Sequence, residues 1–415
     1  MNEIRDLIIG IDFGKEDSQI CYYDRNAKEP RSLSMKVGSA QYEAPTRLCR
    51  RVEQGDYCVG LEAEYFAREK GGFLVENLYD ACKKEDPVLV AGEQKEPWEL
   101  LSYFLKGMLK FLGVMEVIKN TKCLVITSPS LGEIQVKNYQ KACESLGIPS
   151  EKYLLMDYGE SFFYYILTQK REMWNRGVAW YSFKQNEVSC RRLVMNFGTK
   201  PALVKLGDPS AAALSEGENR DQEFCDFIKE TIGMELLSSV QITGKGFDQE
   251  WAKESVKQLC HQKRKVFYGT NLFARGACAA GVERTENKAL KGYQYLSDSL
   301  VLTDIGMDMR VMGSPAYYPL IESGKNWYEC KAYCEFILDD VKELVFVVNR
   351  PLENGEKKRI AMALPGLPVR PNKTTRLSLS LAYTSPRDCQ IQVKDLGFGD
   401  MFPGSGKIWK ESVQW

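Results

Sequence analysis

The stretch Leu7-Ile8-Ile9-Gly10-Ile11-Asp12-Phe13-Gly14 guides the interpretation of the whole chain. Its apolar residues predict a buried strand that ends in an aspartate flanked by two glycines. A β-prone run at residues 19–23 predicts a tight hairpin with this strand. Glycines let the backbone approach a phosphate, and an aspartate can hold Mg²⁺ through water. Gly10, Asp12 and Gly14 are therefore candidates for a phosphate site, with Asp12 as its metal ligand, although a plain β-hairpin explains the same residues.

Around this strand, short apolar runs alternate with amphipathic segments, a pattern typical of an α/β fold. Helices are expected at residues 60–70, 97–112, 133–146, 221–232, 249–260 and 272–281. Further strands are expected at residues 123–127, 153–157, 178–182, 188–195, 202–206 and 240–243. After about residue 290 the strand pattern dominates, at residues 344–348, 377–381 and 389–393. Turn residues separate these runs, which predicts an all-β, sandwich-like module at the end of the chain.

Composition narrows the choice of partners and location. The 415 residues suggest two or three domains, and 56 basic residues balance 56 acidic ones, so neither nucleic acid nor a membrane is an expected partner. The single histidine, His261, excludes zinc sites that need two histidines and is expected on the surface. Thirteen scattered cysteines without a CxxC pair, and no leader or apolar run of about 18 residues, favour a reducing cytoplasm.

Three loops, in order along the chain, resemble those of the actin-like ATPase superfamily, specifically the seventy-kilodalton (DnaK-type) heat-shock chaperones. Residues 10–18 resemble the first phosphate loop of that family. Residues 241–247, with Gly244 and Gly246, resemble its adenosine loop, and residues 271–280 resemble the Ala/Gly-rich helix that follows. The resemblance implies a binding site for ATP or ADP with Mg²⁺, formed by Gly10, Asp12, Gly14, Lys15, Lys83, Gly244 and Gly246.

The same resemblance implies a domain plan for the chain. Residues 1–165 would form lobe I and residues 166–288 a reduced lobe II of a two-lobed, actin-like (ribonuclease H-like) ATPase fold. Residues 289–415 resemble the β-sandwich substrate-binding domain of the family, without its helical lid. The chain is thus expected to be a divergent, degenerate and lidless relative of these chaperones.

Several positions depart from the family pattern. Its second phosphate loop should fall at residues 178–187, where Ser182 replaces an aspartate and Lys184, Gln185 and Asn186 replace glycines. Glu16 and Lys15 replace threonines in the first loop, and a glutamate there would repel phosphate. Phosphoryl transfer depends on positioning and electrostatics, so these changes argue against efficient ATP hydrolysis.

The catalytic positions depart as well. Tyr158 stands where the family has its catalytic glutamate, which leaves Asp157 and Glu160 as displaced candidates. Cys82 stands in register with the catalytic lysine, and Lys83 lies one place later. If the chain is active, it would be an ATP hydrolase.

The leading hypothesis is a pseudoenzyme: a non-catalytic or weakly nucleotide-binding scaffold whose C-terminal β-module binds a peptide or protein. Strand addition to an exposed sheet edge would be the natural binding mode. One alternative is an ATP-dependent chaperone in which Asp157 or Glu160 supplies the missing catalytic carboxylate. Another is an actin-like assembly protein, in which the lobe surfaces polymerise.

Overall fold

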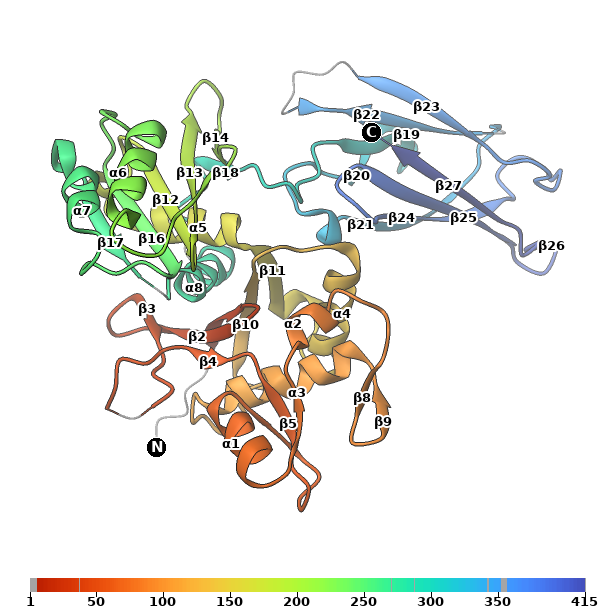
Figure 1. Ribbon diagram of the computed structural model, residues 1–415. Coiled ribbons are helices and arrows are strands. Elements are labelled where there is room, and N and C mark those ends of the chain that lie inside the picture. The colour runs from red at the N-terminus through yellow and green to blue at the C-terminus, as the bar shows by residue number, and fades with distance from the viewer. Residues whose placement is uncertain are drawn as a thin grey trace. The chain divides into compact units, whose positions relative to one another are not determined.

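The computed structural model describes residues 6–36, 38–269, 271–286, 288–341, 343–351 and 357–414 of a mixed α/β protein with a strand-rich C-terminal region (Figure 1). The chain divides into two compact units, the first ending at Tyr295 and the second beginning at Leu296. The sequence placed a boundary after residue 288. The division falls later because β18 (Tyr293–Tyr295) pairs in parallel with β14 (Ala202–Leu206) and so extends a sheet of the first unit.

The two main sheets of the first unit share one strand order (Figure 1). A central strand pairs antiparallel with the next strand, which pairs antiparallel with a third, and two parallel strands follow on the other side. From edge to edge, the strands of the first sheet are β11 (Tyr153–Asp157), β10 (Thr121–Ser128), the central β1 (Leu7–Phe13), β2 (Asp17–Asp24) and β3 (Glu29–Ser32). The corresponding strands of the second sheet are β17 (Lys265–Tyr268), β16 (Ser239–Lys245), the central β12 (Val178–Lys184), β13 (Glu187–Asn196) and β14. One topology is therefore repeated along the chain.

Short strands extend or accompany these two sheets. Two of them, β4 (Ala44–Pro45) and β15 (Ser210–Ala213), pair with β2 and β13. A small sheet consists of β6 (Tyr57–Val59), β5 (Leu48–Arg50) and β7 (Phe73–Val75). A separate hairpin joins β8 (Val88–Val90) to β9 (Glu93–Lys95).

The structure has helices at the six expected segments and also at residues 78–81 and 158–167, where the sequence did not predict them. They are α1 (Leu61–Glu69), α2 (Leu78–Ala81), α3 (Pro97–Lys110), α4 (Glu133–Ser145), α5 (Tyr158–Leu167), α6 (Arg220–Thr231), α7 (Lys253–Leu259) and α8 (Leu272–Thr285). Short 3₁₀ turns occur at Ser150–Lys152, Arg171–Met173, His261–Lys263 and Trp327–Glu329. In the described ranges, no helix is long and apolar enough to cross a membrane.

The helix expected at residues 249–260 is shorter in the structure, where α7 spans Lys253–Leu259. The Asp221 carboxylate accepts hydrogen bonds of 2.8 Å from the backbone amides of Glu254 and Ser255, which caps the first turn of α7. The helix therefore begins at Lys253, a start set by a residue on another helix.

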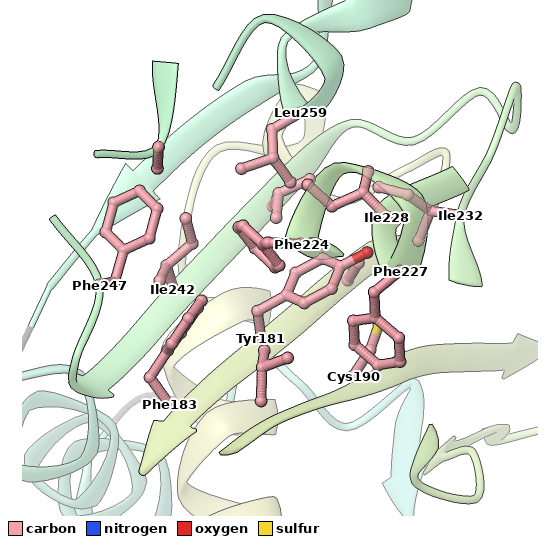
Figure 2. Packing of buried hydrophobic residues seen from close by; sticks show 14 of the residues in the cluster. Tyr181, Phe183, Cys190, Phe224, Phe227, Ile228, Ile232, Ile242, Phe247 and Leu259 are labelled. Carbon is pink, nitrogen blue, oxygen red and sulfur yellow. The ribbon is translucent and has the colours of Figure 1, made fainter. Parts of the chain in front are cut away.

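Helices cover both faces of the second sheet, and β12 shows this alternation residue by residue. Ala179, Tyr181 and Phe183 pack against residues of α6 and α7, as Figure 2 shows for the two aromatic side chains. Val178 and Trp180 belong instead to a cluster with residues of α5 and α8. Trp180 and Tyr181 are thus core residues that face opposite sides of the sheet.

Small residues allow α8 to pack directly against its neighbours. A Cβ atom on Gly276 would overlap the Ser161 carbonyl oxygen of α5, and one on Gly10 of β1 would overlap the Ala274 carbonyl oxygen and the Cys278 amide of α8. Ala274, Cys278 and other small side chains form a buried cluster with residues of the first sheet. The Ala/Gly-rich composition of α8 is therefore explained by backbone-to-backbone packing.

The second unit consists of two antiparallel sheets. One has the order β20 (Ser314–Ile321), β19 (Asp304–Val311), β22 (Glu343–Asn349) and β23 (Lys358–Ala363). The other has the order β21 (Lys331–Ile337), β24 (Arg376–Tyr383) and β25 (Asp388–Phe398), and β25 also pairs with β26 (Phe402–Pro403) and β27 (Ile408–Gln414). Leu377, Leu379 and Leu381 are buried in strict alternation, which gives this strand, predicted from the sequence at residues 377–381, one core face.

Candidate functional site

The candidate site lies where β1 ends and α5 begins. Asp12, the penultimate residue of β1, is only 5% exposed. Its Oδ1 accepts a hydrogen bond of 2.7 Å from the hydroxyl of Tyr158, the first residue of α5. Tyr158 is therefore bonded directly to Asp12, the candidate metal ligand.

Burial controls the charge of this pair. It raises the pKa of Asp12 to about 7, while the Tyr158 hydrogen bond lowers the pKa and the nearby Asp17 charge raises it further. Burial and the adjacent Asp12 charge raise the pKa of Tyr158 well above its usual value, so the phenol keeps its proton and donates. A carboxyl group that is only partly ionised near neutral pH is a poor ligand for a divalent cation, because cation binding requires the deprotonated form.

The Tyr158 ring is held in place by an aromatic neighbour, and its hydroxyl lies close to Gly14. It stacks on Phe273 of α8 with ring centroids 3.7 Å apart and an interplanar angle of 6°. A Cβ atom on Gly14 would lie 3.1 Å from the Tyr158 hydroxyl oxygen. The tyrosine thus fills the space beside the glycine that the sequence predicted would face a phosphate.

The two displaced catalytic candidates lie next to Tyr158, and the structure gives one of them a structural task. Asp157 is the N-cap of α5, and its Oδ1 accepts a hydrogen bond of 2.7 Å from the backbone amide of Glu160. Both side chains are half-buried. The Asp157 carboxylate therefore stabilises the helix start that positions Tyr158.

The two candidate lysines, Lys15 and Lys83, both contact residues of α2. Lys15 Nζ lies 3.1 Å from an oxygen of Asp80 in α2, and Lys83 Nζ lies 4.3 Å from the centroid of the Tyr79 ring in the same helix. The structure thus brings Lys15 and Lys83 to one short segment. These are exposed or partly exposed contacts, so each contributes at most about 1 kcal/mol to stability.

Lys245, at the end of β16, joins the second sheet to the same hairpin. Its ammonium group pairs with the Asp17 carboxylate and lies 3.5 Å from an oxygen of Glu16. Glu16, which the sequence predicted would repel a phosphate, therefore has a cation beside it. Lys245 therefore links the second sheet to the β1–β2 hairpin of the first sheet through side chains.

Gly244 and Gly246 have positive φ angles of 88° and 118°, a conformation that favours glycine. Added Cβ atoms would overlap the carbonyl oxygens of Phe183 and Gln185 in the β12–β13 hairpin. The resemblance implied that an adenosine ligand would lie against these glycines. In the structure, the backbone of the neighbouring hairpin lies there. Gly10 likewise is explained by packing, since the backbone of α8 lies against it.

Arg220 is a site residue that sequence reasoning missed. It is 9% exposed, and its Nη2 donates to the Gln185 carbonyl at 2.7 Å and to the Gly246 carbonyl at 3.2 Å. Its Nη1 donates to Asn186 Oδ1 at 2.8 Å, and its guanidinium carbon lies 4.8 Å above the Trp251 ring. Arg220 therefore binds together the two loops expected to face a nucleotide. An arginine at the start of an amphipathic helix gave no sequence signal for this role.

Comparisons with known proteins give two family matches. A model described as "Family of unknown function (DUF5716) C-terminal" matches residues 29–298. A model described as "Domain of unknown function (DUF8552)" matches residues 300–415. No curated protein matches the chain. In the part of the chain that the structure describes, there is no group of three or more His, Cys, Asp or Glu residues that could hold a metal ion.

Proposed function

The chain belongs to the family of unknown function DUF5716, and we propose that it is a non-catalytic scaffold built on a degenerate actin-like fold. In this proposal, side chains of the protein occupy the former nucleotide site. The C-terminal unit then carries the function, by binding a peptide or protein partner.

The repeated topology supports the two-lobed, actin-like part of the proposal. The sheets around β1 and β12 have the same strand order and the same strand directions. A fold made of two similar halves requires such a repeat, and helices α5 and α8 contribute residues to the cluster on one face of β12. The two antiparallel sheets of the second unit have the alternating burial that a β-sandwich requires.

The observation that carries the proposal is the hydrogen bond from Tyr158 to Asp12. It commits Asp12, the candidate metal ligand, to an internal donor, in a buried place where its pKa is about 7. In the same position a glutamate would offer a negative charge to a metal or a water molecule, whereas a tyrosine offers a hydrogen-bond donor and a bulky ring.

The residues present do not fit a magnesium nucleotide. Tyr158 lies beside Gly14, Lys245 pairs with Asp17, and Arg220 bonds to the loop carbonyls around Gln185. Each cation that would attract phosphate thus has a protein group beside it.

The exposed edge of β20 supports the partner-binding part. β20 pairs with β19 at one edge of its sheet, and every residue from Ser314 to Pro319 is exposed. Tyr317 and Tyr318 are 48% and 39% exposed and point to opposite faces of the strand. An extended peptide can add to such an edge through backbone hydrogen bonds, with the tyrosines as side-chain contacts.

Thermal unfolding with MgATP or MgADP at millimolar concentration tests the closed nucleotide site. We expect no change in Tm with either nucleotide and no metal-dependent phosphate release. A nucleotide present at 100 times its Kd would instead stabilise the folded chain by about 2.7 kcal/mol. Stabilisation of that size that disappears in Asp12→Asn would contradict the proposal and favour the ATP-dependent chaperone.

A further inference from the structure

A polar cavity lies within the second unit, away from the nucleotide-site residues. Its volume is about 510 Å³, within the range of known small-ligand sites. Three parts of the chain line it: residues 297–303, which precede β19, Arg350 after β22, and Pro386 with Arg387 in the turn between β24 and β25. The sequence gave no signal for this cavity, because these segments are far apart along the chain.

The lining combines positive charge with apolar surface. Arg350 is half-buried and Arg387 is exposed, and among the described lining residues the only carboxylate is the exposed Asp298. Leu300 and Leu302 supply apolar surface on the segment before β19. Guanidinium groups present paired donors that match the two oxygens of a carboxylate.

Hydrogen bonds hold both walls of the cavity. On one side, the backbone amide of Thr384 donates to the Asp388 carbonyl at 2.9 Å, and the Asp388 amide donates to Ser385 Oγ at 3.1 Å. These bonds close the turn that presents Arg387. A site formed before its ligand arrives loses little conformational entropy on binding.

The other wall is tied to the segment before β21. Ser297 Oγ donates to Asn326 Oδ1 at 3.1 Å, and the Trp327 amide donates to the Ser299 carbonyl at 2.9 Å. Asn326 is 7% exposed and also forms a β-bridge with Leu300. The segment that carries Leu300 and Leu302 is therefore anchored at several points.

A buried tyrosine adds a donor near Arg350. The Tyr383 side chain is 3% exposed, and its hydroxyl has no hydrogen-bond partner of good geometry in the described part of the chain. Thr303 and Arg350, which line the cavity, lie close enough to lower the pKa of this hydroxyl against the larger opposite effect of burial. A buried hydroxyl without a partner is a donor for an acceptor oxygen placed next to it.

We propose that this cavity binds a carboxylate carried next to an apolar side chain, the chemistry of a polypeptide C-terminus. Arg350 and Arg387 would bind the carboxylate, and Leu300 and Leu302 the apolar side chain. The negative Asp298 disfavours a more highly charged anion such as phosphate. This inference rests on the proposed partner-binding role of the second unit, and it specifies the part of the partner that is recognised.

Fluorescence anisotropy with the full-length chain tests the inference. The probes are a labelled hexapeptide that ends in leucine with a free carboxylate, and the same peptide with a C-terminal amide. We expect the free acid to bind at least about tenfold more tightly, the size expected when hydrogen bonds to a charged group are lost. Arg350→Ala and Arg387→Ala should remove this difference, and Arg387, being exposed, can be replaced without loss of the fold.

A matched control is Arg359→Ala, which removes an exposed arginine that pairs with Asp308 in the same unit and does not line the cavity. It should leave both affinities unchanged. N-acetyl-leucine that competes as well as the peptide would identify a free acid, instead of a chain terminus, as the source of the carboxylate. Competition by inorganic phosphate at the same concentration would overturn the assignment to an apolar carboxylate.

The outcomes separate this inference from the proposed function. Equal binding of the acid and the amide would overturn the carboxylate site and leave strand addition at β20 intact. Binding of neither peptide at millimolar protein concentration would count against both. Unchanged affinity for the acid in Arg350→Ala and Arg387→Ala would also overturn the site.

Discussion

Replacing Tyr158 with phenylalanine removes one oxygen atom from the centre of the candidate site. The ring can stay stacked on Phe273, since the contact between the two rings does not involve the hydroxyl. The change therefore reports on the hydrogen bond to Asp12, which has a length of 2.7 Å in a site where Asp12 is 5% exposed. Hydrogen bonds to charged groups contribute about 1.5–3 kcal/mol, and neutral ones about 1 kcal/mol.

The sign of the pH dependence follows from the pKa of Asp12. Because this pKa is raised from 3.8 to about 7, the folded chain holds a proton between these values that the unfolded chain has released. The Asp12 contribution to stability is thus complete below about pH 4 and is lost as the pH rises to about 7, on the order of 4 kcal/mol in total. Tyr158 lowers the pKa of Asp12, so Tyr158→Phe should raise it further and extend the loss of stability to higher pH.

We therefore expect Tyr158→Phe to cost about 1 kcal/mol near pH 5, where Asp12 is protonated, and about 1.5–3 kcal/mol near pH 8. The measurement is urea unfolding, monitored by pulsed hydrogen exchange and mass spectrometry of a peptide that contains β1. This peptide reports the free energy of unfolding of the first unit selectively. Tyr181→Phe is the matched control, because the Tyr181 hydroxyl bonds to Thr231 at 2.6 Å and its partner carries no charge. Its cost should be the same at both pH values.

A cost of Tyr158→Phe that does not change between the two pH values would refute the reasoning. It would mean that Asp12 does not titrate in the folded chain, or that the hydroxyl does not bond to it. A stabilising effect of the substitution at high pH would refute it as well, because the ionised carboxylate would then prefer a site without the phenol.

Three further predictions concern other parts of the chain. Asp395→Asn breaks a buried bidentate pair with Arg370 and should cost roughly 3–5 kcal/mol in urea unfolding of the second unit. Arg370 lowers the pKa of Asp395, so the native pair loses its stabilising effect as the pH falls, and the variant should show a weaker acid dependence. Gly276→Leu, at the crossing of α5 and α8, should cost about 3 kcal/mol or more in thermal unfolding. Gly269→Ala, which has open space around it, should change the stability little. Equal effects of the two substitutions would contradict the packing argument. Lys245→Met removes an exposed pair and should cost about 1 kcal/mol or less, an effect that disappears at high salt; a large, salt-independent loss would show a buried role.

Local sequence patterns predicted six helices and the central strands of the first unit but missed α5. Hydrophobic periodicity is a local property, so it placed β11 at Tyr153–Asp157 and the start of α4 at Glu133 correctly. It also indicated the all-β character of the C-terminal region through the alternation around Leu379. It did not place the start of α7, because the Asp221 carboxylate that caps this helix belongs to α6.

The sequence also named most side chains around the candidate site, among them Asp12, Gly14 and Lys15. What these side chains contact depends on the fold. Tyr158 is 146 positions from Asp12 along the chain, and Arg220 is 35 positions from the Gln185 carbonyl it binds. Hydrogen-bond partners, and the burial that moves the pKa of a carboxyl group toward neutrality, depend on which distant segments the fold brings together, and no local pattern of residues records them.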